Sequence, residues 1–178
     1  MTPMGPPKHL VLLGMMGAGK TRTGASVSVH LGWPFLDGDA VLEAQQGRTG
    51  AQIAAADGVD HLHRLEEQVL LDALAAEQPS VIAPAACVVE DVRCVEAMRA
   101  GAAVVWLDLP ADHLETRMRR GAHRRAMDST ELLELVQRRR PRFAVVADLH
   151  LDATAATEDL VAAIVAHLGD QVARRSTT

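Results

Sequence analysis

The sequence has few cysteines and no excess of positive charge, and each absence excludes a class of protein. Only two cysteines occur, Cys87 and Cys94. They lack the C-x-x-C spacing of zinc ligands or redox pairs, so neither a disulfide framework nor a zinc site is predicted and both should be buried thiols. The formal net charge of -5 provides no positive field for nucleic acid or anionic membranes. We therefore expect a small soluble ligand and no nucleic-acid partner.

The N-terminus also lacks the features of a targeting segment. Its first eight residues include three prolines, and the apolar run that follows is only a few residues long. This pattern matches neither a signal peptide nor a membrane-spanning helix. We expect a cytoplasmic protein with no membrane partner.

No internal repeat, low-complexity tract or long linker divides the chain. Its 178 residues, 48% of them hydrophobic, are enough to build one buried core. Short apolar runs alternate with longer segments of helical period, which is typical of βαβ units around a parallel sheet. We predict a single α/β domain over residues 1–178, a monomer with a five-stranded parallel sheet flanked by helices.

The expected elements follow from this alternation. Strands are predicted at residues 9–15, 35–37, 80–83, 103–109 and 149–152. Helices are predicted at residues 20–31, 40–46, 51–56, 59–76, 90–99, 111–120, 130–140 and 158–174. Thr49 and Gln52 are spaced as a capping box for the third of these helices. Residues 121–129 are polar, basic and poor in structure signals, and we interpret them as a mobile loop.

A glycine-rich motif lies between the first predicted strand and the first predicted helix. Residues 14–21, GMMGAGKT, fit the pattern G-x-x-x-x-G-K-[ST]. In this pattern backbone N–H groups and the helix N-terminus surround nucleotide phosphates, the lysine contacts the β- and γ-oxygens, and the hydroxyl binds Mg²⁺. The motif predicts ATP and Mg²⁺ binding in a three-layer P-loop NTPase fold. The residues assigned to the nucleotide are Gly14, Gly17, Ala18, Gly19, Lys20, Thr21 and Arg22.

Two aspartates, Asp37 and Asp39, follow the second predicted strand. They lie at the edge where α/β sheets bind ligands. One carboxylate can hold Mg²⁺ and its waters, while the other orients or deprotonates an attacking hydroxyl. An alternative is that an aspartate caps the helix beginning near residue 40, and for Asp39 both functions can hold.

With these motifs the sequence resembles the shikimate kinase family over nearly its whole length. The segments that carry the resemblance are residues 14–21, 36–39, 47–49, 64–67, 104–107 and 139–143. The resemblance implies an ATP-dependent kinase that phosphorylates a hydroxyl of a small molecule, shikimate in the family. It also implies that Lys20 and Thr21 handle phosphate and Mg²⁺, that Asp37 supports the metal, and that Asp39 binds the acceptor hydroxyls as the base.

The same resemblance assigns three arginines. It places Arg117 beside the adenine and Arg124 in a lid at about residues 121–129, where it reaches the phosphates. Arg139 is expected to meet the carboxylate of an acceptor held by helices at about residues 40–76. Lys20, Asp39 and Arg124 are the implied catalytic residues.

The departures from the family's pattern lie on the acceptor side. In the family an arginine of the segment G-E-x-x-F-R-x-x-E pairs with the shikimate carboxylate, and His63 takes its position here. An imidazole cannot form the planar two-point contact of a guanidinium. The family's three glycines after the third strand become Pro84, Ala85 and Ala86, which removes a backbone N–H and obstructs positive φ angles and close approach. The phosphate-donor residues are therefore kept while the acceptor site is changed.

The predicted acceptor site consists of Asp39, His63, Glu66, Ala85, Ala86 and Arg139. His63 is expected either to line the pocket, paired with Glu66, or to be a solvated surface residue. A metal shared by His61 and His63 is not expected, because helix residues two apart point in different directions. Two functional alternatives are open: a different hydroxylated acceptor, such as a polyol or hydroxy acid, and a nucleotide-binding regulator without catalysis.

Overall fold

A parallel five-stranded sheet forms the centre of the computed structural model, which describes residues 7–119 and 129–175. The strands are β1 (His9–Leu13), β2 (Phe35–Asp37), β3 (Val81–Ala83), β4 (Ala102–Asp108) and β5 (Leu149–Asp152). Their order is β2-β3-β1-β4-β5, and each neighbouring pair is parallel. The carboxyl ends of all five strands therefore lie at the same edge of the sheet.

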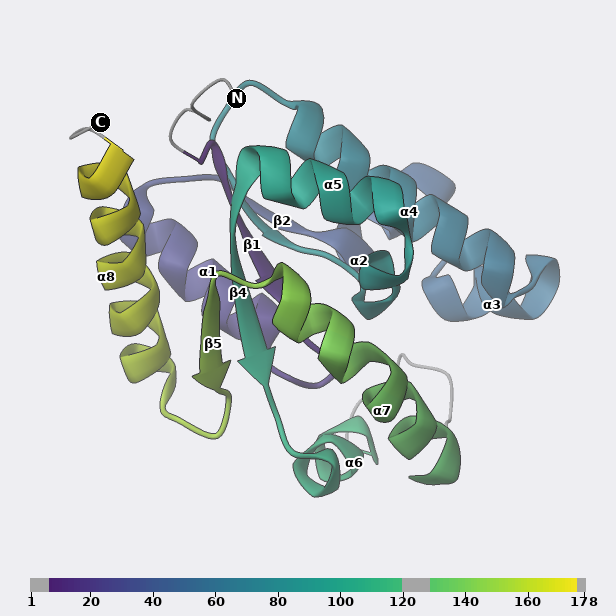
Figure 1. The fold of residues 1–178 in the computed structure, drawn as a ribbon. Helices are drawn as coiled ribbons and strands as arrows, with labels where there is room; N and C mark the ends of the chain where they lie inside the picture. Colours follow the sequence, from purple (N-terminus) through teal and green to yellow (C-terminus); the bar gives the residue numbers. More distant parts are fainter. Residues whose placement is uncertain (1–6, 120–128, 176–178) are drawn as a thin grey trace.

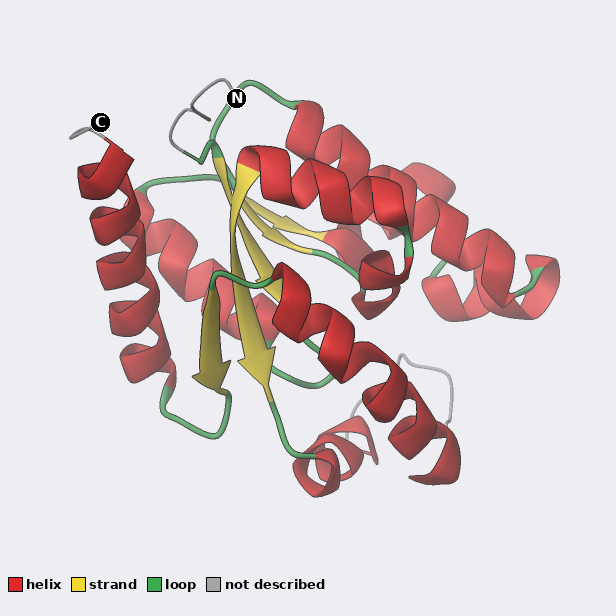
Figure 2. Ribbon diagram, in the orientation of Figure 1, coloured by secondary structure: helices red, strands yellow, loops and turns green. Residues whose placement is uncertain are grey.

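Helices on both faces of the sheet complete three layers (Figure 1; Figure 2), as the sequence predicts. On one face lie α1 (Lys20–Leu31) and α8 (Thr157–Arg175), and on the other α5 (Val92–Gly101) and α7 (Ser129–Val146). The remaining helices are α2 (Gly38–Gln46), α3 (Gly50–Asp57), α4 (Val59–Ala75) and α6 (Ala111–Arg119). Both α2 and α3 pack against α4, which in turn packs against α5. None of the helices in the described part of the chain is long and apolar enough to cross a membrane.

The core is centred on β1 and β4. Every residue of β1 is buried, and four of its five residues are apolar, as expected for a parallel strand covered on both faces. The exception, His9, is fully buried but has hydrogen-bond partners. Its Nδ1 lies 2.9 Å from the Ser80 hydroxyl, and its Nε2 lies 3.2 Å from the Ala76 carbonyl oxygen. Burial lowers the pKa of His9, so a neutral imidazole can remain in the core.

The predicted elements are present, but several boundaries were wrong. The first strand ends at Leu13 and not at residue 15, because the chain turns at Gly14 with a φ of 146°. The helix predicted to stop at residue 140 continues through Pro141 to Val146. Its last turns bury Phe143 completely, and this packing outweighs the hydrogen bond that proline removes.

One element was not predicted, and one helix start was misplaced. Residues Ala86–Glu90 form a short 3-10 helix, η1. The following helix, α5, begins at Val92 with Asp91 as its cap, two residues later than expected. By contrast, the capping box of α3 is confirmed, because Thr49 and Gln52 exchange side-chain to backbone hydrogen bonds of 2.8 and 3.2 Å. Residues 121–128 of the expected loop lie outside the described residues.

Candidate active site

The loop between β1 and α1 turns at the carboxyl edge of the sheet. Gly14, Gly17 and Gly19 have positive φ angles of 146°, 86° and 96°. A Cβ atom on Gly14 would lie only 2.5 Å from the carbonyl oxygen of Leu107 on β4. Glycine is therefore required at position 14 both by the backbone angle and by the neighbouring strand.

The start of α1 is suited to bind anions. Its N-cap residue is Gly19, so no side chain caps the backbone N–H groups of the first turn, and that turn contains no acidic residue. Lys20 Nζ donates hydrogen bonds to the carbonyl oxygens of Gly14 at 2.9 Å and Met15 at 3.3 Å. These contacts hold the ammonium group against the loop. Since the backbone N–H groups of a helix start, the helix dipole and an ammonium all attract negative charge, the loop has the properties of a phosphate site.

Thr21 and Asp37 bring two oxygen ligands together beside this loop. The Thr21 hydroxyl donates a hydrogen bond to Asp37 Oδ2 at 2.6 Å. Hydroxyl and carboxylate oxygens are the hard ligands that Mg²⁺ prefers, so these residues fit the predicted metal site. Asp37 Oδ1 accepts hydrogen bonds from the backbone N–H groups of Asp39 and Ala40. The cap of α2 is therefore Asp37, and the capping function considered for Asp39 was wrong.

Asp39 lies in the first turn of α2 and is exposed. The turn that carries it packs closely on the end of β3. A Cβ atom on Gly38 would lie 3.2 Å from the Ala83 carbonyl oxygen and 3.3 Å from Pro84 Cα. The residues that follow β2 and β3 are thus in contact, and the Asp39 carboxylate is accessible beside them.

Glu66, on α4, has a raised pKa of about 7. Burial is the main cause and the Asp39 charge adds to it, while the hydrogen bond from Cys87 and the charges of Arg139 and Lys20 lower the pKa. Hydrogen bonds join the segments of the predicted site in pairs: Thr21 to Asp37 between the loop and the end of β2, Cys87 to Glu66 between η1 and α4, and Arg139 to Glu90 between α7 and η1.

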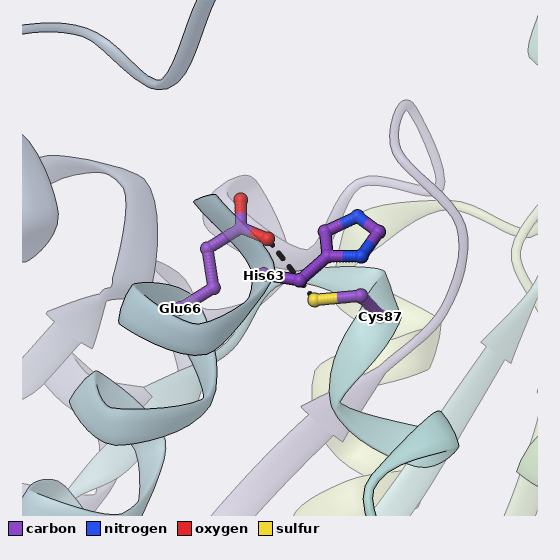
Figure 3. A group of neighbouring side chains, drawn as sticks. All are labelled: His63, Glu66 and Cys87. Carbon is purple, nitrogen blue, oxygen red and sulfur yellow. Dashed lines mark hydrogen bonds between the residues drawn. The ribbon is translucent and has the colours of Figure 1, made fainter. Parts of the chain in front are cut away.

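The hydrogen-bond partner of Glu66 is Cys87. The Cys87 thiol, on η1, donates to Glu66 Oε2 at 3.0 Å, and His63 lies beside both side chains (Figure 3). The structure therefore places His63 near Glu66, the arrangement of one of the two alternatives, and a cysteine completes the group. Burial, followed by the charge of Arg139, lowers the pKa of His63. The lowered pKa favours the neutral imidazole, which provides no fixed charge for an anionic acceptor.

Arg139, expected at an acceptor carboxylate, is held by an acidic side chain of the protein itself. Its Nε donates a hydrogen bond of 2.7 Å to Glu90 Oε1, and only 4% of its side chain is exposed. Arg138 donates to the same oxygen at 3.2 Å. Burial alone would raise the pKa of Glu90, but the hydrogen bonds and charges of the two arginines outweigh it and lower the pKa. An ionised Glu90 therefore offsets the charge of Arg139.

The segment Pro84–Ala85–Ala86 is accommodated without backbone strain. Ala85 is extended, with φ −60° and ψ 152°, and among the described residues only glycines have positive φ angles. The chain then enters η1, which turns the next residue, Cys87, toward α4. The substituted segment therefore leads directly into a short helix.

Three predicted nucleotide residues have no further support from the structure. Arg22 is exposed on the first turn of α1. Arg117 belongs to α6, but its side chain is outside the described part, and Arg124 lies wholly outside the described residues. Their functions stay predictions.

Comparison with known proteins agrees with this geometry. A model of the family described as shikimate kinase matches residues 16–169. This chain belongs to the shikimate kinase family. It is 36% identical over 170 residues to a shikimate kinase of Symbiobacterium thermophilum, which covers 92% of this chain and 97% of that protein. A shikimate kinase of Mycobacterium leprae is 34% identical over 154 residues, covering 80% of this chain and 72% of that protein.

A solved structure supports the same assignment. The shikimate kinase of Acinetobacter baumannii in complex with shikimate has a TM-score of 0.83 and 26% identity, covering 91% of this chain and 92% of that chain. As a member of this family the chain is an ATP-dependent small-molecule kinase that uses Mg²⁺. The enzyme class and cofactors expected from the sequence are confirmed.

Proposed function

We propose that this kinase transfers the γ-phosphoryl group of ATP to a hydroxyl of a small polyhydroxylated acceptor, of which shikimate is the family's example. The observation that carries the proposal is the hydrogen bond between Thr21 and Asp37, which places the turn that carries the exposed Asp39 beside the glycine-rich loop. The Lys20 ammonium, held on that loop, and the exposed Asp39 carboxylate therefore belong to neighbouring segments. This arrangement suits the transfer of a phosphoryl group to an alcohol.

Each residue has a defined task in this reaction. The loop and Lys20 hold the β- and γ-phosphate oxygens, while Asp39 orients the acceptor hydroxyl and accepts its proton. Thr21 and Asp37 would hold Mg²⁺, which would supply positive charge against the phosphates. Phosphoryl transfer needs little covalent help from the protein, so positioning and charge stabilisation provide most of the rate enhancement.

The acceptor residues favour a second candidate, a polyol or hydroxy acid other than shikimate. His63 is neutral, and Glu90 offsets the charge of Arg139 at 2.7 Å. A charge-assisted hydrogen bond contributes about 1.5 to 3 kcal/mol, so loss of an arginine contact to a carboxylate should weaken binding by roughly ten- to a hundredfold. Shikimate should therefore bind this chain more weakly than it binds a member with arginine at position 63.

The release of ADP, measured with ATP and Mg²⁺ across shikimate, polyols and hydroxy acids, tests the proposal. At least one acceptor should stimulate ADP release, and mass spectrometry should show its phosphate ester. ATP binding without release of ADP to any acceptor, under conditions in which the fold is intact, would contradict the proposed reaction.

Two substitutions test the choice of acceptor. His63→Arg and Glu90→Gln should each lower the KM for shikimate, because one adds a carboxylate contact and the other leaves the charge of Arg139 without its counter-charge. Glu96→Gln, on the exposed surface of α5, is the matched control for Glu90→Gln and should leave the KM unchanged. Efficient shikimate turnover by the unaltered chain, with a KM in the usual micromolar to millimolar range, would show that the pocket compensates for His63.

A further inference from the structure

Three side chains that commonly bind metals meet where α4 faces η1. The candidate ligand atoms of His63, Glu66 and Cys87 all lie within 4.8 Å of one another. In the described ranges, 7–119 and 129–175, this is the single group of three or more such residues with that spacing. His63 and Glu66 are three residues apart on α4 and so share one side of the helix. Cys87 reaches them from η1, which packs against α4. Figure 3 shows the three side chains side by side.

The separations suit one metal ion after a small adjustment. Zinc bonds of about 2.0 to 2.3 Å place neighbouring ligands roughly 3.3 to 3.6 Å apart in a tetrahedral site. Cys87 Sγ and Glu66 Oε2 are already 3.0 Å apart across a hydrogen bond, and a metal that replaces the proton would separate them by a few tenths of an ångström. The third ligand, His63, is only half-buried, so rotation of its side chain can close a gap of about 1 Å.

The ligand types discriminate between metals. Mg²⁺ takes oxygen ligands, whereas imidazole nitrogen and thiolate sulfur select zinc and similar transition metals. Thr21 and Asp37 already provide the oxygen site. We infer that His63, Glu66 and Cys87 form a second metal site, specific for a divalent transition-metal ion such as Zn²⁺. Binding would release the thiol proton, and any proton on the carboxyl, to the solvent.

Some charges near His63, Glu66 and Cys87 favour a bound cation, and others oppose it. The positive charge of Arg139 acts on all three side chains and opposes a cation. Glu90 offsets that charge through its 2.7 Å hydrogen bond, and the Asp39 charge, which also reaches Glu66, favours a cation. Three protein ligands leave a fourth position for water or for an oxygen of the acceptor. The inference does not depend on which acceptor the kinase uses.

Cobalt titration of the untagged chain without nucleotide tests the site directly. Co²⁺ bound to a thiolate gives an intense near-ultraviolet charge-transfer band, which oxygen ligands at Thr21 and Asp37 cannot produce. We expect one equivalent of Co²⁺ to produce this band and one equivalent of Zn²⁺ to abolish it. Zn²⁺ should also slow the alkylation of Cys87 under mildly denaturing conditions. Absence of the band in the unaltered, folded chain would overturn the inference without any variant.

Variants then assign the ligands. Cys87→Ser should abolish the charge-transfer band, and His63→Ala should weaken Zn²⁺ binding at least tenfold in equilibrium dialysis. The matched control is Cys94→Ala, because Cys94 is also a buried thiol but donates only to a backbone carbonyl, that of Glu67 at 3.7 Å. It should keep the band. A band that persists in Cys87→Ser, or is lost equally in Cys94→Ala, would place the metal elsewhere. Phosphoryl transfer plays no part in these readouts, so they remain informative even if no acceptor is found.

Discussion

Replacing Glu66 by glutamine should change how the stability of the fold depends on pH. Burial raises the pKa of Glu66 from 4.5 to about 7 in the folded chain. The folded state therefore binds this proton more tightly than the unfolded state. Since the folded state holds more protons between these two values, the free energy of unfolding decreases as the pH rises through that window.

The size of the effect follows from the same shift. Each pKa unit corresponds to about 1.4 kcal/mol, so the carboxyl should cost the fold roughly 2 to 3 kcal/mol between pH 5 and pH 8. Glutamine carries no charge at either pH, and its amide oxygen can still accept the hydrogen bond of the Cys87 thiol. Relative to the unaltered chain, Glu66→Gln should gain that amount of stability at pH 8 and little at pH 5.

Urea unfolding followed by circular dichroism at both pH values measures this difference. A chelator should be present, so that metal bound at Glu66 does not contribute to stability. Glu96→Gln, on the exposed surface of α5, is the control and should shift the free energy of unfolding by less than about 0.5 kcal/mol. The reasoning is refuted if the stability difference between Glu66→Gln and the unaltered chain is the same at pH 5 and pH 8.

Three further substitutions test the phosphate and acceptor sides. Lys20→Met should abolish phosphoryl transfer and leave the circular dichroism spectrum intact, because the ammonium contacts the loop and not the core; unchanged turnover would contradict the assigned function of Lys20. Asp39→Asn should greatly lower kcat and keep the ATP affinity measured by calorimetry, and an equal loss of ATP binding would move Asp39 to the metal side. Gly14→Ala should lower the unfolding temperature and the ATP affinity, because the added Cβ would lie 2.5 Å from the Leu107 carbonyl oxygen at a φ of 146°. The free energy of unfolding should fall by about 2 kcal/mol or more. An unchanged unfolding temperature would refute this prediction.

The sequence locates the glycine-rich loop and the two aspartates because their signals are local. The loop at residues 14–21 follows the end of β1, and Asp37 and Asp39 lie where α2 begins after β2. The position of each short segment therefore depends on the end of a single strand. The acceptor side depends on contacts between distant segments. Cys87 meets Glu66, and Glu90 meets Arg139, across 21 and 49 residues of chain, and no spacing rule relates such pairs.

Packing between elements also explains errors in local structure. Proline at position 141 predicts a helix end, but burial of Phe143 extends α7 to Val146. Two aspartates could cap α2, and residue type alone does not choose between them. The choice of Asp37 follows from the position at which β2 ends, which places its carboxylate in front of the free N–H groups of Asp39 and Ala40.

The two oxygens of the Asp37 carboxylate have different partners, and this limits how many of them can bind a metal ion. One oxygen is engaged by two backbone N–H groups of α2, and the other faces the Thr21 hydroxyl. Asp37 would therefore offer one oxygen to an ion beside Thr21, and the other ligands would be water or phosphate, which Mg²⁺ commonly keeps. Glutamate at position 37 would add one methylene group and could not keep both contacts from the same backbone position. The same short side chain of aspartate thus both caps α2 and provides the oxygen beside Thr21, so a change at position 37 would affect both.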